Sequence, residues 1–302
     1  MKNILKTYGP NFNGRDFVIG DLHGGYPAFQ NLVREIHFDP FKDRIFSTSD
    51  LVDRGPNSYE CLQLLREPWF CCSNANHEQM MFEAFNGGWM GKYWLRNGGG
   101  WGLEALTAHN KRRADPAFVI DDKSADIIDL VNLAGELPFM MTLNHKNGKK
   151  FHFIHAELPS SRSAEVDDEM LADPEKVYEL ATTQAADGDT FLWGRYVFMP
   201  FYGIHLTKEK VVRSVKGRHI ERLQNENRSM IISGHTIMTQ PLTIMGQTNI
   251  DTCAYGSCNP DPDGWEALTC IELDTWTFYQ ATPTTFKVVE PLTVNKEDLE
   301  DI

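Results

Sequence analysis

Short apolar runs recur in the first third of the chain, and each of them leads into a cluster of polar side chains. The runs Phe17-Val18-Ile19 and Arg44-Ile45-Phe46 fit strands that are buried on both faces of a sheet. Residues 26–37 and 58–66, which lie between and after these runs, suit helices. The alternation of strand and helix predicts parallel crossover units, whose strands open their carboxyl ends on one edge of the sheet.

The polar clusters stand about 25 to 30 residues apart, roughly the length of one crossover unit. They comprise Asp21 and His23, then Asp50, Asp53 and Arg54, and finally Asn76, His77 and Glu78. Because parallel strands bring their carboxyl ends to the same edge, we expect these side chains to converge on one site.

The residue types in these clusters point to a metal centre. Carboxylate oxygen, amide oxygen and imidazole nitrogen together suit manganese, iron or zinc. The clusters offer more ligands than one small ion needs, which favours two ions about 3.5–4 Å apart that share the carboxylate of Asp50. Such ions make a coordinated water nucleophilic near neutral pH, and the guanidinium fork of Arg54 suits phosphate oxygens. The residues therefore indicate hydrolysis of a phosphate ester.

The clusters also resemble the signature blocks of the phosphoprotein phosphatase family, the metallophosphoesterase branch that contains serine/threonine phosphatases. The blocks read Asp21-Leu22-His23-Gly24, Asp50-Leu51-Val52-Asp53-Arg54-Gly55 and Asn76-His77-Glu78. The chain is most similar to phage and bacterial members of the lambda protein phosphatase type, and the similarity continues through Asn97-Gly98-Gly99-Gly100-Trp101. It returns at Phe153-Ile154-His155-Ala156, Trp193-Gly194-Arg195 and Ser233-Gly234-His235-Thr236.

The resemblance implies a role for each of these side chains. Asp21 and His23 would hold the first metal, and Asp50 would bridge both metals. Asn76, His155 and His235 would complete the second metal. His77 would be the general acid, held by Asp53, while Arg54 and Arg195 would bind the phosphoryl oxygens.

The resemblance also implies the fold. We expect an α/β structure, a metallophosphoesterase-like sandwich of two mixed β-sheets flanked by helices. A single calcineurin-like metallophosphoesterase domain would cover residues 1–302, with insertions on the rim of the site near residues 158–190 and 196–227.

Three positions depart from the family pattern. Ser49 and Ala75 stand where the family usually has glycine, and Asn74 stands where phage-type members commonly have arginine. Serine and alanine are the smallest replacements, so we expect the site to shift rather than to be blocked. Asn74 removes one phosphate-binding cation, which leaves the strength of phosphate binding and the substrate range open.

The rest of the chain predicts further elements. Strands at residues 140–143 and 150–155 flank the hairpin signal Asn147-Gly148, and another strand covers residues 229–233. Short strands at residues 242–245, 248–251, 267–273 and 277–281 predict a second sheet that packs on the first. Helices are expected near residues 169–181 and 125–136, and a surface loop at residues 111–122.

Two later features have two interpretations each. Asp251 either holds His235 in the correct tautomer or is simply structural. The basic run that contains Lys208, Lys210 and Arg213 is interpreted as a solvated helix face, with guidance of an acidic substrate as the alternative.

Composition limits the partners and the compartment. The net charge is −13, from 29 basic and 42 acidic residues, which argues against general affinity for nucleic acid. The chain has no apolar run long enough to span a membrane. The six cysteines are expected to be free buried thiols in a reducing compartment, so we expect a cytoplasmic protein.

The functional hypothesis that follows is a metal-dependent serine/threonine phosphatase. It would hydrolyse a phosphorylated protein or peptide through a water activated by two divalent ions, manganese being preferred and iron or zinc remaining open. The alternative is a hydrolase of diadenosine tetraphosphate, but such relatives commonly have Asp where this chain has Glu78 and lack the Asp that is Asp53 here. A metal-binding protein without catalysis is disfavoured because all inferred ligands and the His77–Asp53 pair are present.

Overall fold

Three buried runs form the parallel half of one sheet in the computed structural model, which describes residues 3–182, 190–259 and 264–299. The strands are β2 (Asp16–Ile19), β3 (Arg44–Ser47) and β4 (Phe70–Cys72), and they pair in this order. Between them run the helices α1 (Tyr26–Glu35) and α2 (Ser58–Gln63), the latter followed by η1 (Leu64–Arg66). The crossover units predicted from the apolar runs are therefore present.

The other half of this sheet comes from the C-terminal part of the chain. Strand β10 (Leu268–Glu272) pairs antiparallel with β2, and β11 (Thr277–Ala281) and β12 (Phe286–Val289) extend the sheet to the order β12-β11-β10-β2-β3-β4. The expectation that β10 and β11 belong to the second sheet is wrong. Their alternating pattern identifies a hairpin but does not say which sheet edge the hairpin will join, because that choice depends on tertiary packing.

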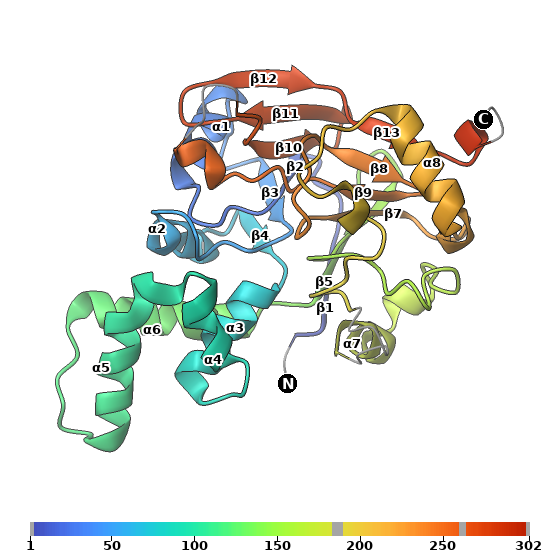
Figure 1. The fold of residues 1–302 in the computed structure, drawn as a ribbon. Helices are drawn as coiled ribbons and strands as arrows, with labels where there is room; N and C mark the ends of the chain where they lie inside the picture. The colour runs from blue at the N-terminus through green and yellow to red at the C-terminus, as the bar shows by residue number, and fades with distance from the viewer. Residues whose placement is uncertain (1–2, 183–189, 260–263, 300–302) are drawn as a thin grey trace.

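The second sheet has seven strands in the order β1-β5-β6-β7-β9-β8-β13. They are β1 (Leu5–Tyr8), β5 (Met140–Asn144), β6 (Lys150–Phe153), β7 (Met230–Ser233), β8 (Leu242–Ile244), β9 (Gln247–Asn249) and β13 (Leu292–Val294). The hairpin of β5 and β6 forms as predicted, with Gly148 at φ +84° in its turn. The two mixed sheets and their flanking helices confirm the predicted fold class (Figure 1).

The helices gather at the ends and outer faces of the sheets (Figure 1). α1 packs on β10, β11 and β12, whereas α3 (Asn76–Asn86) packs against α4 (Gly91–Trp94), α5 (Leu103–Ala114) and α6 (Asp122–Gly135). The last regular helices are α7 (Pro174–Thr182) and α8 (Lys208–Arg218). Short 3₁₀ turns are η2 (Leu95–Asn97), η3 (Gly99–Gly102), η4 (Met170–Ala172), η5 (Met199–Phe201), η6 (Ile220–Leu223), η7 (Gly256–Cys258) and η8 (Glu297–Leu299).

Two helix expectations need correction. The segment at residues 111–122 is not all loop, because α5 continues to Ala114. The helix expected at residues 169–181 is interrupted at Asp173, whose backbone is extended at φ −93° and ψ 114°. The ring of Pro174 disfavours helical geometry in the preceding residue and starts α7 afresh.

The segments that were predicted to be insertions contain α7 and α8. α8 buries Val211, Val212 and Val215, while Lys208, Lys210 and Arg213 are exposed, and Lys208 pairs with Asp298 at 2.6 Å. This arrangement favours the solvated-face interpretation of the basic run. Residues 183–189 of the first segment lie outside the described residues, and the boundaries of both insertions stay a prediction.

One of the buried apolar clusters lies between the two sheets. Phe46 of β3 stacks on Phe153 of β6 with ring centroids 4.9 Å apart, and Val18, Ile232 and Ile271 surround the pair. All six cysteines are free as expected, and five of them are buried. No helix in the described ranges is both long enough and apolar enough to cross a membrane.

Replacing the stacked ring should weaken the contact between the sheets. We expect Phe153→Ala to lower the free energy of unfolding by about 3–5 kcal/mol, because the buried ring leaves a cavity that neighbours fill only partly. Phe41→Ala is the matched control, since Phe41 is 94% exposed, and should change stability by less than about 0.5 kcal/mol. Urea unfolding followed by circular dichroism measures both, and equal effects would contradict the assigned core.

Candidate metal centre

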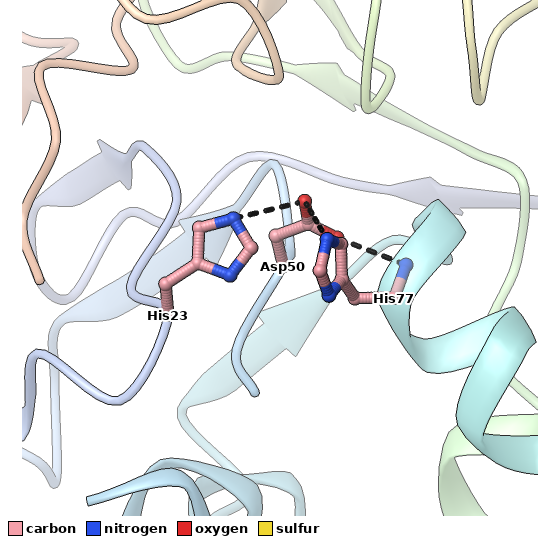
Figure 2. A group of neighbouring side chains, drawn as sticks. All are labelled: His23, Asp50 and His77. Atoms are coloured by element: carbon pink, nitrogen blue, oxygen red, sulfur yellow. Dashed lines mark hydrogen bonds and ion pairs between the residues drawn. The ribbon is translucent and has the colours of Figure 1, made fainter. Parts of the chain in front are cut away.

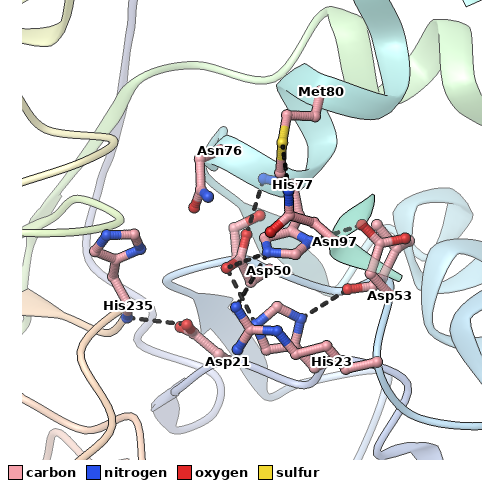
Figure 3. A network of polar contacts seen from close by, with 12 residues as sticks. Asp21, His23, Asp50, Asp53, Asn76, His77, Met80, Asn97 and His235 are labelled. Atoms are coloured by element: carbon pink, nitrogen blue, oxygen red, sulfur yellow. Dashed lines mark hydrogen bonds and ion pairs between the residues drawn. The ribbon is translucent and has the colours of Figure 1, made fainter. Parts of the chain in front are cut away.

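The predicted site residues lie at the carboxyl ends of five strands. Asp21 follows β2, Asp50 follows β3, and Asn76 begins α3 just after β4. In the other sheet, His155 follows β6 and His235 follows β7. The edges of both sheets meet here, so residues far apart in the sequence come together (Figure 3).

The loops that carry these residues have an unusual backbone. Positive φ angles occur at six non-glycine residues of the site, namely His23, Ser49, Asp50, Asp53, Arg54 and His235. Each such residue costs on the order of 1–3 kcal/mol and persists only where the surrounding packing over-determines it. The clustering indicates that the loops are shaped for a site rather than for local stability.

One group of donor atoms joins the two sheets. Nε2 of His155 lies 2.7 Å from Oδ1 of Asn76, 3.0 Å from Nδ1 of His235 and 3.4 Å from Oδ2 of Asp50. The ligand atoms of Asp50, His155 and His235 all lie within 4.8 Å of one another. The four residues predicted to hold the second metal are therefore brought together.

A second group contains His23, Asp50 and His77, whose ligand atoms also lie within 4.8 Å of one another (Figure 2). Nε2 of His23 is 3.2 Å from Oδ2 of Asp50. Asp21 is not a member of either group. Its Oδ2 accepts the backbone N–H of His235 at 2.9 Å, so this carboxylate lies beside the group and faces the protein (Figure 3). Its role as a metal ligand stays a prediction.

The donor set fits divalent cations on a direct physical test. Nδ1 of His23 faces the carbonyl of Val52 at 2.8 Å, and Nδ1 of His155 faces the carbonyl of Thr48 at 3.1 Å. Each neutral ring donates its one proton to that carbonyl, so the Nε2 lone pairs point at the carboxylate of Asp50. Lone pairs facing a carboxylate repel each other unless positive charge lies among them.

The pKa values of the site residues show the same demand for positive charge. Burial lowers the pKa of His23, lowers that of His155 to about 4, and lowers that of His235 well below its usual value. Neutral imidazole is the form that binds metal. Burial, and then the charge of Asp251 and of Asp50, raise the pKa of Asp21 well above its ordinary value.

His77 and Asp53 form a tight pair at one side of these groups. Nδ1 of His77 lies 2.6 Å from Oδ2 of Asp53, and Nε2 lies 3.2 Å from Nη2 of Arg54. Burial alone would lower the pKa of His77, but the charges of Asp50 and Asp53 outweigh it and raise the pKa. The pair with Asp53 therefore fixes the orientation of the imidazole, and the two carboxylates favour its protonated form.

The two arginines predicted to bind phosphate are the most accessible members of the site. Arg54 is exposed and lies over the ring of Tyr255, with its guanidinium carbon 5.6 Å from the ring centroid. Arg195 is half-buried, and its Nη1 donates to Oγ1 of Thr236 at 3.5 Å, a long hydrogen bond. Neither guanidinium is paired with a carboxylate in the described ion pairs, so both have donors left for an anion.

Of the two interpretations of Asp251, the first, in which it orients His235, is not supported by the hydrogen bonds of the described residues. Oδ1 of Asp251 accepts the backbone N–H of Cys253 at 3.0 Å. Oδ2 of Asp251 and Nε2 of His235 are both buried without a hydrogen-bond partner among the described residues. Burial raises the pKa of Asp251 to about 6, with the charge of Asp50 adding to the effect.

Sequence reasoning missed the residues that support the loop of Asp50. Oε2 of Glu78 accepts the hydroxyl of Ser49 at 2.8 Å, and Oε1 accepts the backbone N–H of Leu51 at 2.9 Å. The two bonds flank Asp50 on both sides. Ser49, which stands in place of a family glycine, thus gives a hydrogen bond that glycine lacks, although its φ is +85°. The sequence signal for this contact was the replacement of the family glycine by Ser49, which the sequence analysis interpreted as a shift of the site.

A comparison with protein families identifies the class of this chain. The calcineurin-like phosphoesterase family matches residues 17–238. The chain belongs to this family, which implies divalent metal ions at the group of His and Asp side chains described above.

Curated relatives include bacterial protein phosphatases. Serine/threonine-protein phosphatase 1 of Salmonella typhimurium strain LT2 is 39% identical over 146 residues, which is 48% of this chain and 60% of the relative. The chain therefore spans less than two thirds of that relative's length. Serine/threonine-protein phosphatase 2 of the same organism is 27% identical over 243 residues, 80% of this chain and 89% of the relative. A symmetrical bis(5'-nucleosyl)-tetraphosphatase of Aggregatibacter actinomycetemcomitans is 48% identical over 50 residues, 17% of this chain and 18% of the relative.

Solved structures share the fold at low sequence identity. The crystal structure of a protein assigned as a diadenosine tetraphosphatase superposes with a TM-score of 0.52 at 15% identity and covers 93% of this chain and 98% of its own. Such a likeness shows the fold alone.

The hydrogen bond from Ser49 to Glu78 leads to a stability prediction. We expect Ser49→Ala to lower the free energy of unfolding by about 1–3 kcal/mol, because a buried carboxylate oxygen loses its donor while the positive φ remains. Ser49→Gly loses the same bond but relieves roughly 1 kcal/mol of backbone strain, so it should cost less. Urea unfolding at neutral pH compares the two variants. A Gly variant less stable than the Ala variant would contradict this account.

Proposed function

We propose that this chain is a metal-dependent phosphomonoesterase that acts on phosphoserine and phosphothreonine in proteins or peptides. The observation that carries the proposal is the position of the His77–Asp53 pair beside Asp50, the one carboxylate common to both donor groups. A proton donor next to a two-cation centre is the combination that a phosphate ester with a poor leaving group requires.

The cations would be held in two places. Asp50, Asn76, His155 and His235 would hold one, and Asp21, His23 and Asp50 the other, as the family resemblance implies. When bound, two divalent ions supply a nucleophile at neutral pH and neutralise charge on the phosphoryl oxygens. We propose manganese, since the mixed oxygen and nitrogen donors suit it, with iron and zinc as the alternatives.

The protein side chains would handle the substrate and the proton. Arg54 and Arg195 would bind phosphoryl oxygens through their free N–H donors. Nε2 of His77 would give its proton to the departing serine or threonine oxygen, and Asp53 would hold Nδ1 so that Nε2 faces the substrate. Arg54, whose Nη2 lies 3.2 Å from this nitrogen, would keep the phosphate close to the acid.

Asn74 narrows the set of phosphate-binding cations. Its side chain is buried, and its Oδ1 has no hydrogen-bond partner among the described residues. An arginine there would add a positive charge, so phosphate binding in this chain would depend on Arg54 and Arg195. The net charge of −13 argues against nucleic acid as a substrate. We propose a cytoplasmic location on the basis of the free cysteines.

A pocket beside the acid supports a second candidate function. It has a volume of about 360 Å³ and is lined by Met80, Trp89, Met90, Tyr93, Asn97 and Trp193. Aromatic rings of this kind can stack on a nucleobase, which suits hydrolysis of a dinucleotide polyphosphate such as diadenosine tetraphosphate. Glu78 and Asp53 differ from the pattern common in relatives with that activity, so the phosphatase is preferred.

A substrate panel separates the two functions. The protein is stripped with a chelator, reloaded with manganese, and assayed with phosphoserine, phosphothreonine and phosphotyrosine peptides beside diadenosine tetraphosphate. We expect the phosphoserine and phosphothreonine peptides to have the highest kcat/KM, and the stripped protein to be inactive until metal is restored. A higher kcat/KM for the dinucleotide would replace the leading function with the second candidate.

The acid role of His77 can be tested by changing its side chain. We expect His77→Asn to lower kcat about 10²–10⁴-fold for a phosphoserine peptide, because general acid catalysis is worth this much for a poor leaving group. The loss should be smaller for 4-nitrophenyl phosphate, whose leaving group departs without a proton. Metal content by atomic emission should stay at the unaltered level. Equal losses for both substrates would contradict the assignment.

A further inference from the structure

The carboxylate of Asp53 receives more hydrogen bonds than the pairing with His77 requires. The indole Nε1–H of Trp94 donates to its Oδ1 at 3.1 Å, and that of Trp101 donates to the same oxygen at 2.8 Å. Its Oδ2 receives His77 at 2.6 Å. Two indole donors thus occupy one oxygen and leave the other to the imidazole.

The segment around the two tryptophans is built to permit this contact. Gly98 has φ +111°, and a Cβ there would lie 2.6 Å from the backbone nitrogen of Arg54 and 3.0 Å from Cβ of Asp53. A Cβ on Gly99 would lie 2.4 Å from the indole of Trp94. The glycines therefore let the turn between η2 and η3 pack directly on the loop of Asp53.

Ordinary satisfaction of buried groups does not explain both bonds. Trp94 is fully buried and needs an acceptor for its N–H, so its bond has a structural reason. Trp101 is only half-buried and could bond to water, yet its donor is aimed at the same carboxylate oxygen. The two rings meet edge to face, with centroids 6.1 Å apart and planes at 86°. This geometry fixes the plane of the carboxylate from two directions.

We propose that Trp94 and Trp101 are positioning residues for the general acid: they lock the Asp53 carboxylate so that its Oδ2 holds Nδ1 of His77 and Nε2 faces the leaving oxygen. The proposal rests on the proposed phosphomonoesterase function. A buried carboxylate with two lone pairs on each oxygen can rotate between partners, and charge-assisted bonds from two indoles remove that freedom. The acid is then supported by protein contacts alone, in the way that outer hydrogen bonds orient a ligand.

The first test measures turnover of aryl phosphates whose leaving phenols span a range of acidity, with the manganese-loaded full chain. Trp101→Phe keeps the ring and removes the N–H. We expect roughly a 10-fold fall in kcat for the poorest leaving groups and little change for 4-nitrophenyl phosphate. Trp276→Phe is the matched control. Trp276 stacks on Phe151, is distant from His77 in the sequence, and has no described hydrogen bond to Asp53. An equal fall with every leaving group would overturn the proposal.

A double-mutant comparison tests whether the effect passes through His77. In the His77→Asn background, Trp101→Phe should cause no further loss, because the acid on which it acts is already absent. A further loss of the same size as in the unaltered enzyme would assign Trp101 a merely structural role and would overturn the proposal. Thermal unfolding of each variant, measured by circular dichroism, verifies that the chain is folded.

A third measurement is independent of turnover. In a ¹⁵N-tryptophan NMR spectrum, we expect the Nε1–H signals of Trp94 and Trp101, assigned with their Phe variants, to move when Asp53→Asn replaces the carboxylate by a neutral amide. The signal of Trp276 should stay. Unmoved signals would overturn the contact whatever the substrate is. Moved signals with no phosphate ester turned over by the unaltered chain would instead overturn the proposed function.

Discussion

The buried carboxylate of Asp50 imposes the main constraint on this structure. Its Oδ2 faces Nε2 of His23 at 3.2 Å and Nε2 of His155 at 3.4 Å, while the other nitrogen of each ring faces a backbone carbonyl. Acceptors gathered so closely need positive charge among them. Electrostatic interactions, and not the apolar core, therefore determine how the side chains are arranged at the edge where the two sheets meet.

The same demand explains the backbone of the loops. The geometry of a regular helix or strand cannot direct the side chains of Asp50, Asp53 and Arg54 into one small space. The backbone therefore adopts left-handed conformations at these three residues. Glu78 offsets part of the free-energy cost of these left-handed conformations, because it accepts hydrogen bonds from both neighbours of Asp50. Burial raises the pKa of Glu78 to about 7, and the charge of Asp50 adds to this effect. The support that Glu78 gives to the loop therefore depends on the charge of Asp50.

Sequence reasoning recovers the parts of this molecule that depend on local signals. The apolar runs of β2 and β3 and the Asn147-Gly148 turn each define their own element, and ordered motifs define which strand ends must meet. Sequence reasoning fails where the structure depends on which segments, distant in the sequence, pair with one another. The hairpin of β10 and β11 joins β2 rather than the other sheet, and β1, with its half-exposed pattern, has no run to reveal it.

In the site, the side chains of the motifs were predictable, but their supports were not. Ser49 looked like a small disturbance, and the structure gives it a specific bond to Glu78. Trp101 was noted only as part of the stretch of family resemblance, and the structure shows its indole bonded to Asp53. Such contacts depend on the direction of a single N–H or O–H group, and residue type and spacing carry no information about direction.

The two halves of the site are stabilised by different physics. Around His155 and His235, acceptors face acceptors, and Nε2 of His235 is buried with no partner among the described residues, so this half of the site calls for positive charge. Around His77, donors meet acceptors: Asp53 takes Nδ1, Asp50 takes the backbone N–H, and Arg54 approaches Nε2. The orientation of His77 is therefore fixed by contacts within the protein. Asp50 belongs to both halves, because its Oδ2 faces the imidazole of His155 and its Oδ1 accepts the backbone N–H of His77. The position of Asp50 therefore couples the order of the two halves.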